Sequence, residues 1–258
     1  MRIARFTTGE DPRYGIVEGE AGAEQISVVS GDPLYSALTP TGEKVPLDEV
    51  RLLAPVIPRS KVIGIGKNYA DHAAEMGGEV PEAPLVFFKP NTSVIGPDDP
   101  IVLPSFSEEV HYEGELAVVI GRICKDVPRE RVKDVIVGYT CANDVTARDA
   151  QRTDGQWARA KGFDSSCPLG PWLETELDVE NLRLQTRLDG ATVQDGNTAD
   201  LVFDVPELVS YVSRAFTLLP GDVILTGTPA GVGPIQPGQR VEVEVEGIGT
   251  LSNQVVRR

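Results

Sequence analysis

Two acidic residues at a spacing of two, Glu113 and Glu115, are the side chains in this sequence best suited to metal chemistry. They stand at the head of the apolar run at 116–120, which is typical of a strand buried on both faces. Because side chains alternate along a strand, both carboxylates would point to the same side. Neighbouring carboxylates at the edge of a core repel each other and lose hydration, and a bound divalent cation offsets both penalties. The alternative is an amphipathic strand end whose two glutamates lie in water.

A third carboxylate, that of Asp144, is a candidate to complete such a site. It follows the β-prone residues 135–140, and an acid at the end of a buried strand can complete a three-carboxylate site. Carboxylate oxygens suit Mg²⁺, Mn²⁺ or Ca²⁺, so the three residues predict a site for one of these ions. An aspartate in this position is also typical of a turn or a helix N-cap, and that interpretation stays open.

The segment NYADHAAE at 68–75 contains a candidate acid–base pair, His72 and Glu75. Residues three apart share one face of a helix, and a histidine oriented by a carboxylate is a general base for activating water. The chain has only two histidines, so any histidine chemistry must use His72 or His111. The alternative is a surface helix with an ordinary histidine.

Two lysines, Lys89 in FFKP and Lys161 in RAKGFD, stand beside aromatic or small residues. Each is either a solvated lysine or a buried cation that faces an anion. The glycine-rich segment 64–68 suggests a phosphate loop, but position 61 is lysine where a P-loop needs glycine, and position 68 is asparagine where it needs serine or threonine. Nucleotide binding is therefore not predicted from this segment.

Composition limits the class of protein. The formal net charge of −15 argues against binding to nucleic acid or anionic membranes, but a small anionic substrate needs only a local positive site. No segment approaches the roughly 20 apolar residues of a membrane helix, and the N-terminus lacks the apolar region of a signal peptide. Three cysteines without a CxxC spacing indicate a reducing compartment, so we expect a cytoplasmic protein.

The pattern of apolar residues predicts a β-rich α+β fold. Proline residues at 55 and 58 bracket a predicted linker that follows several short strands. One amphipathic helix is predicted at 205–218, with Asp204 and Glu207 forming a capping box and the Pro-Gly pair at 220–221 ending the helix. A shorter helix is predicted at 129–137. The predicted strands include 2–7, 14–18, 26–29, 240–246 and 250–256.

Seven segments in this order resemble the fumarylacetoacetate hydrolase family, from about residue 61 to the C-terminus. They are GKNYADHAAE (66–75), FFKP (87–90), YEGELAVVIG (112–121), NDVTARD (143–149), QWARAKGFD (156–164), LLPGDVILTGTPAGVG (218–233) and IGTLSN (248–253). The resemblance implies a mixed β-sandwich roll at 56–258, preceded by a small N-terminal β domain at 1–55. It also implies a homodimer.

The resemblance assigns a role to each candidate residue. Position 111, often acidic in the family, is histidine here, where it could tune the metal site or pack as a polar residue. The divalent metal would be Mg²⁺ or Mn²⁺, with Ca²⁺ a weaker candidate. The implied metal ligands are Glu113, Glu115 and Asp144, the implied catalytic residues are His72, Glu75 and Lys161, and the implied substrate contacts are Lys89, Arg148, Gln151 and Thr228.

The activity implied is metal-dependent hydrolysis of a C–C bond in an acylpyruvate- or fumarylpyruvate-type 1,3-diketo acid, through a metal-bound enolate. Its substrate would be a small 2-oxo acid, and aromatic catabolism is the usual context. The same residues suit decarboxylation of oxaloacetate or isomerisation of 2-hydroxyhepta-2,4-diene-1,7-dioate, in the 5-carboxymethyl-2-hydroxymuconate pathway. A metal-binding protein without activity is the remaining alternative, and the presence of every candidate residue argues against it.

Overall fold

The computed structural model describes residues 1–20 and 22–257, and its strand-rich α+β fold confirms the predicted class. No helix in these ranges is both long and apolar enough to cross a bilayer. The strands are β1 (Arg2–Thr7), β2 (Arg13–Glu18), β3 (Gln25–Ser30), β4 (Thr39–Pro46), β5 (Arg51–Leu53), β6 (Val62–Gly66), β7 (Leu85–Lys89), β8 (Val94–Ile95), β9 (Ile101–Leu103), β10 (Val110–Tyr112), β11 (Gly114–Ile120), β12 (Ile136–Asn143), β13 (Thr146–Ala147), β14 (Cys167–Glu174), β15 (Arg183–Leu188), β16 (Ala191–Asn197), β17 (Val223–Leu225), β18 (Gly233–Pro234), β19 (Arg240–Val245) and β20 (Gly249–Arg257). The α-helices are α1 (Ala70–Glu75), α2 (Arg148–Thr153), α3 (Ala158–Gly162) and α4 (Val205–Ala215), and 3₁₀ turns cover Leu47–Glu49, Asn91–Ser93, Arg129–Asp134 and Thr198–Asp200.

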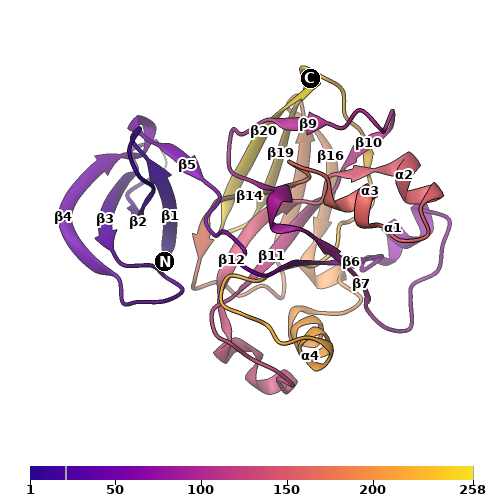
Figure 1. The fold of residues 1–258 in the computed structure, drawn as a ribbon, viewed down its shortest axis with the longest axis horizontal. Helices are drawn as coiled ribbons and strands as arrows, with labels where there is room; N and C mark the ends of the chain where they lie inside the picture. The colour runs from indigo at the N-terminus through magenta and orange to yellow at the C-terminus, as the bar shows by residue number, and fades with distance from the viewer. Residues whose placement is uncertain (21, 258) are drawn as a thin grey trace.

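One large sheet connects the N-terminal strands to the rest of the molecule. Its order is β4-β3-β2-β1-β14-β12-β11-β17-β6-β7, and β1 pairs antiparallel with β14, with Ile3 opposite Leu173. Figure 1 shows β1 to β4 as a curved lobe beside the main body, which also contains a five-stranded sheet of β16, β15, β19, β20 and β9. The lobe is therefore joined to the main body by strand pairing as well as by the chain.

The proline-flanked segment at 52–58 differs from the linker that the sequence predicts. β5 pairs back onto β1, and Ala54 and Val56, which follow it, are buried in an apolar cluster with Ile3 and Val62. Burial of these side chains removes apolar surface from water, so the segment packs as part of the core. The proposed boundary near residue 55 stays a prediction.

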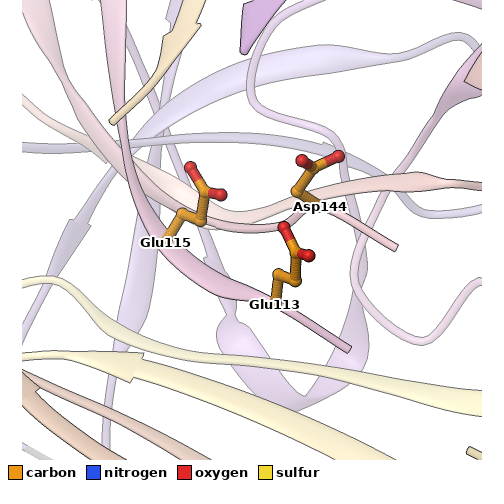
Figure 2. A group of neighbouring side chains, drawn as sticks. All are labelled: Glu113, Glu115 and Asp144. Carbon is orange, nitrogen blue, oxygen red and sulfur yellow. The ribbon is translucent and has the colours of Figure 1, made fainter. Parts of the chain in front are cut away.

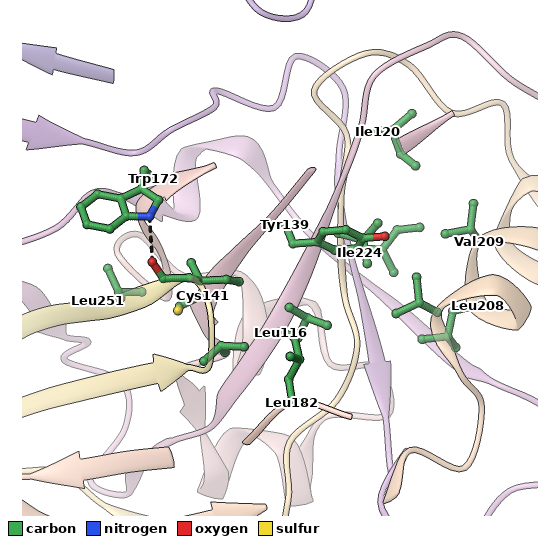
Figure 3. Packing of buried hydrophobic residues seen from close by; sticks show 14 of the residues in the cluster. Leu116, Ile120, Tyr139, Cys141, Trp172, Leu182, Leu208, Val209, Ile224 and Leu251 are labelled. Carbon is green, nitrogen blue, oxygen red and sulfur yellow. Dashed lines mark hydrogen bonds between the residues drawn. The ribbon is translucent and has the colours of Figure 1, made fainter. Parts of the chain in front are cut away.

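The main core lies between the central strands and α4. Every residue of β11 is buried, as the continuous apolar run predicts. Figure 3 shows Leu116, Ile120 and Ile224 of the sheet in one apolar cluster with Leu208 and Val209 of α4. Burying each of these side chains stabilises the fold by roughly 1.5–3 kcal/mol, and this packing fixes β11 against α4.

The helix α4 begins as predicted but ends early. Asp204 caps it by accepting a hydrogen bond from the backbone N–H of Glu207, at 2.9 Å. The prediction of a helix to residue 218 was wrong, because Phe216 has extended backbone dihedrals and packs edge-to-face on Phe88 of β7, with ring centroids 5.0 Å apart. A tertiary contact therefore ends the helix before the Pro-Gly pair at 220–221.

The predicted helix at 129–137 was also wrong over its second half. The structure has a 3₁₀ turn at Arg129–Asp134, and β12 begins at Ile136. The β-branched residues Val135, Ile136 and Val137 favour a strand, and pairing of β12 with β11 provides its hydrogen bonds. This strand matters because its other end holds Asp144.

Candidate active site

Three carboxylates meet where β11 begins and β12 ends. Glu113 directly precedes β11, and Asp144 directly follows β12. The two strands pair antiparallel with Gly114 opposite Asn143, which brings the start of one beside the end of the other. Glu115 lies two residues beyond Glu113, and oxygens of all three carboxylates lie within 4.8 Å of one another (Figure 2). Strand register thus brings together the three acids that the sequence predicts as metal ligands.

Backbone contacts fix these acids in a buried position. The exposed fractions of Glu113, Glu115 and Asp144 are 3%, 1% and 1%. The backbone N–H of Asp144 donates to the carbonyl of Glu113 at 2.8 Å, and that of Glu113 donates to the Asn143 side chain at 2.9 Å. Oε2 of Glu115 accepts a hydrogen bond from the backbone N–H of Gly227 at 2.6 Å. The carboxylates are therefore pre-positioned by the fold.

Cationic side chains contact two of the three acids. Nζ of Lys161 donates to Glu113 at 2.7 Å and to Asp144 at 2.6 Å. Arg148 donates to the second oxygen of Glu113 at 2.6 Å. Lys89, from the end of β7, donates to the second oxygen of Asp144 at 2.6 Å. These ion pairs supply counter-charges to two buried acids in a place where isolated charges would be costly.

The pKa shifts follow from these contacts. Burial raises the pKa of Glu113, but the positive charges of Lys161 and Arg148 outweigh it and hold that pKa well below its usual range. Burial lowers the pKa of Lys161, and the charges of Asp144 and Glu113 outweigh it and raise that pKa. For Glu115, burial and repulsion from Asp144 and Glu113 act together and raise its pKa well above the ordinary value.

The donor set fits a divalent cation. Glu115 accepts a hydrogen bond from a backbone N–H and contacts no cationic side chain among the described residues. A buried carboxylate of this kind lacks a counter-charge, and a cation placed among the three acids would supply it. The ligand atoms are all carboxylate oxygens, which Mg²⁺ and Mn²⁺ prefer. Glu113, Glu115 and Asp144 are the residues that would hold the ion.

A cavity of about 180 Å³ opens onto Glu113 and Glu115. The helix α2 contributes three polar side chains at positions i, i+3 and i+4, which share one helix face. The short helix α3 contributes Lys161, and the region from β6 through α1 forms another wall. The cavity is lined by Ile65, Gly66, Lys67, His72, Met76, Glu113, Glu115, Arg148, Gln151, Arg152, Trp157, Lys161 and Thr228.

The predicted acid–base pair forms at this cavity. His72 and Glu75 lie on α1, and Nδ1 of His72 is 3.2 Å from Oε2 of Glu75. The contact leaves Nε2 as the ring nitrogen free to exchange a proton with a molecule in the cavity. Glu75 also accepts from the backbone N–H of Gly231, at 3.1 and 3.2 Å, which ties α1 to the loop that contains Gly231.

One loop, at 226–233, supports both halves of the site. Gly227 donates to Glu115, Gly231 donates to Glu75, and Thr228 lines the cavity between them. Both glycines have positive φ, +103° and +99°, a conformation that side chains disfavour. A Cβ at Gly231 would lie 2.2 Å from a backbone carbonyl oxygen. Positive φ thus explains the glycine at both positions, and close approach of the backbone adds to it at Gly231.

Three of the predicted substrate contacts line the cavity, and one does not. Arg148, Gln151 and Thr228 line it, and Arg148 donates to Gln151 at 2.7 Å. Lys89 lies behind Asp144, is fully buried and is not among the residues that line the cavity. Its placement supports a role in holding Asp144. A direct contact of Lys89 with substrate stays a prediction.

His111 lies beside the site and not in its cavity. Its Nε2 is 3.2 Å from a carboxylate oxygen of Glu109, and its Nδ1 is buried without a hydrogen-bond partner in the described part of the chain. Burial and the charge of Arg148 lower the pKa of His111, with the nearby carboxylates of Glu109 and Glu113 opposing them. The lowered pKa favours the neutral form of this side chain, and a role in tuning the metal site stays a prediction.

Two residues that line the cavity and one that supports it were not predicted from the sequence. Lys67 and Trp157 belong to quoted motifs, but neither has a spacing that marks it as a ligand contact. Gln194 of β16 donates to Thr228 at 2.8 Å and accepts from the backbone of Gly114 at 3.0 Å. Gln194 is distant in the sequence from both partners, so only the folded chain reveals this contact.

Comparison with known proteins places this site in a family. The model described as fumarylacetoacetate (FAA) hydrolase C-terminal matches residues 61–256, and one described as Rv2993c-like, N-terminal, matches residues 1–55. The structure of 5-carboxymethyl-2-hydroxymuconate delta-isomerase from Mycobacterium smegmatis is 50% identical with a TM-score of 0.93, covering 100% of each chain. The oxaloacetate tautomerase Fahd2a, mitochondrial, of Rattus norvegicus is 44% identical over 82% of this chain and 71% of its own length. Fumarylpyruvate hydrolase from Pseudomonas aeruginosa, in complex with Mn²⁺ and pyruvate, is 34% identical with a TM-score of 0.74, covering 81% of this chain and 92% of that one.

Proposed function

The chain belongs to the fumarylacetoacetate hydrolase family, and from that premise we propose that it is a divalent-metal-dependent enzyme that hydrolyses a C–C bond in acylpyruvate-type 1,3-diketo acids. The observation that supports this most is that His72, oriented by Glu75, lines the same cavity as Glu113 and Glu115. A general base and an oxygen-ligand metal site in one small cavity are the parts that hydrolysis of such a substrate needs. We propose Mg²⁺ as the ion, with Mn²⁺ as the alternative.

The side chains divide the reaction between them. A bound divalent cation supplies Lewis-acid stabilisation of negative charge on the 2-oxo acid end of the substrate. Nε2 of His72 accepts a proton from water, and the resulting hydroxide attacks the distal carbonyl carbon. The C–C bond then breaks, giving a carboxylic acid and the enolate of pyruvate, and the histidine returns the proton to that enolate. Lys161 stabilises the negative charge that develops, and Arg148 and Gln151 orient the carboxylate.

A second candidate is isomerisation or tautomerisation of a 2-oxo dicarboxylic acid. It is favoured by the 50% identity to a delta-isomerase along the whole chain and by the 44% identity to an oxaloacetate tautomerase. Such a reaction needs no attacking water. His72 would move a proton between a carbon and an oxygen of the same molecule, and the other residues would keep the roles given above.

The test is the turnover of acetylpyruvate by metal-stripped protein, with and without added Mg²⁺. Loss of the enol absorbance, together with formation of pyruvate, measures hydrolysis, and we expect both only with Mg²⁺. Loss in metal-stripped protein at the same rate would contradict the metal requirement.

Isomerisation or tautomerisation, the second candidate, is tested by a separate absorbance measurement. If both acetylpyruvate and fumarylpyruvate stay intact in the presence of Mg²⁺, the hydrolase proposal fails. Conversion between the enol and keto forms of oxaloacetate, followed by absorbance and compared with buffer alone, would then test the second candidate. The Glu115→Gln variant serves as a control in both assays, because it retains the shape of the site and removes one proposed ligand charge.

A further inference from the structure

Lys67 is a cationic residue of the cavity wall that the roles above leave unused. It follows β6 directly, lines the cavity and is half-buried. Its side chain forms no hydrogen bond or ion pair within residues 1–20 and 22–257. Its backbone has φ +56°, in the left-handed region that non-glycine residues seldom adopt. The surrounding structure therefore holds this residue in a specific and unfavourable conformation.

The other cations of the wall are already paired. Arg148 contacts Glu113, and Lys161 contacts Glu113 and Asp144. Arg152 is paired with Glu109. Lys67 alone, among the described residues of the wall, has an ammonium group without a carboxylate partner. A half-buried lysine whose ammonium has no carboxylate partner is suited to bind an anion that enters the cavity.

The position of Lys67 indicates which part of a ligand it would meet. Glu113 and Glu115 are almost fully buried, whereas Lys67 is half-buried. A Cβ on Gly78 would lie 2.4 Å from Nζ of Lys67, so the ammonium lies against the turn that follows α1. The cavity thus has a deep end at the acids and a shallower wall at Lys67. A ligand with its 2-oxo acid group at the deep end would extend its other end toward Lys67.

We infer that Lys67 binds a second carboxylate at the distal end of the substrate, so that the site selects 2-oxo acids with two carboxylates over those with one. The inference rests on the proposed function, because that function places the 2-oxo acid group at the three acids. The ammonium of lysine is a point charge at the end of a flexible side chain. It can therefore reach distal carboxylates on substrates of different length.

The test compares two diketo acids in the presence of saturating Mg²⁺. Fumarylpyruvate has a distal carboxylate and acetylpyruvate has none. In Lys67→Met we expect kcat/KM for fumarylpyruvate to fall about tenfold to a hundredfold, mainly through KM, while that for acetylpyruvate stays within about threefold of wild type. Lys67→Arg should recover most of the preference. Lys133→Met removes an exposed lysine that is distant from Lys67 in the sequence, and it controls for the change in net charge.

Equal losses for both substrates would overturn the inference, because they would mean that Lys67 only supports the turn after α1. A second readout does not depend on turnover. It compares the binding of 2-oxoglutarate, which has a terminal carboxylate, with that of 2-oxovalerate, which lacks it. The fluorescence of Trp157 in the cavity wall reports the binding. We expect wild type to bind 2-oxoglutarate more tightly and Lys67→Met to lose that difference.

These experiments distinguish a failure of the inference about Lys67 from a failure of the proposed function. If wild type hydrolyses neither diketo acid, the proposed hydrolysis fails, and the binding pair still decides the role of Lys67. If wild type hydrolyses them and the preference is the same in Lys67→Met, the inference fails while the proposed function stands. If wild type binds both 2-oxo acids equally, the inference fails as well.

Discussion

Among the three acids of the site, Glu115 is the one that most needs the positive charge of a bound cation. Its carboxylate is buried, contacts only a backbone N–H and lies beside two other acids. Burial and repulsion from Asp144 and Glu113 raise its pKa well above the ordinary value. A cation that binds here must therefore displace a proton from Glu115 when the pH lies below that pKa.

We predict that the affinity for Mg²⁺ rises with pH, by about tenfold per unit below the pKa of Glu115 if one proton is displaced. Calorimetry in two buffers with different ionisation enthalpies measures the protons released, and we expect about one. Glu115→Gln should bind Mg²⁺ more weakly and release no proton. An affinity that is constant between about pH 5 and pH 8, without proton release, would show that Glu115 is already ionised.

The acid–base pair gives a second prediction. His72→Gln should lower kcat by about 10²- to 10⁴-fold, because it removes the group that takes a proton from water. Glu75→Gln should lower kcat less, by about tenfold to a hundredfold, since it only disturbs the orientation of His72. Mg²⁺ affinity should stay close to wild type in both. Hydrolysis at the wild-type rate by His72→Gln, at saturating Mg²⁺, would rule out His72 as the base.

At the scale of elements, two strand ends and one glycine-rich loop build the site. β11 and β12 bring the acids together by register, and the loop at 226–233 donates one N–H to Glu115 and another to Glu75. One proposed metal ligand, Glu115, and one member of the proposed acid–base pair, Glu75, are thus attached to the same loop. A distortion of this loop should disturb both.

Gly227→Ala tests this arrangement. The residue has φ +103°, and its Cβ would lie 2.8 Å from Cβ of Asn68, so the loop must shift. We predict a loss of about 1 kcal/mol or more in the free energy of unfolding, together with weaker Mg²⁺ binding. Denaturant unfolding and calorimetry measure the two effects.

Gly155→Ala is the matched control. Its Cβ would meet nothing within 4 Å and its φ is not positive, so it should change neither quantity beyond about 0.5 kcal/mol. Equal effects of the two substitutions would mean that the loop at 226–233 has no special role.

The sequence predicted the elements that depend on local patterns and missed those that depend on distant contacts. The N-cap at Asp204 and the buried run of β11 follow from local rules and agree with the structure. The early end of α4 depends on the packing of Phe216 against Phe88, which lie far apart in the sequence. The position of Lys89 behind Asp144 depends on the sheet order in the same way.

At the scale of the whole molecule, apolar side chains are exposed at one edge of the large sheet. β7 is the terminal strand, and Leu85 and Phe88 are 38% and 42% exposed. An apolar edge strand is prone to pair with another chain. Together with the homodimer that the family resemblance implies, this edge indicates a surface that a second copy could cover.

We predict a homodimer in solution, with a mass twice the 27.7 kDa of one chain. Sedimentation analysis measures the mass, and Leu85→Lys, which places a charge on the edge strand, should shift the protein toward the monomer. The exposed Lys133→Met serves as the control variant. A wild-type mass of one chain at micromolar concentration would contradict the prediction.

We propose that one cavity holds a divalent cation beside a histidine that moves protons to and from an enolate. Exchange of the C3 protons of pyruvate with D₂O, followed by NMR, tests this claim most directly, because hydrolysis and isomerisation share that proton transfer. We predict exchange well above the buffer rate with Mg²⁺ and wild type, and exchange at the buffer rate with metal-stripped protein or His72→Gln. Exchange at the buffer rate with Mg²⁺-loaded wild type, or unchanged exchange in His72→Gln, would contradict it.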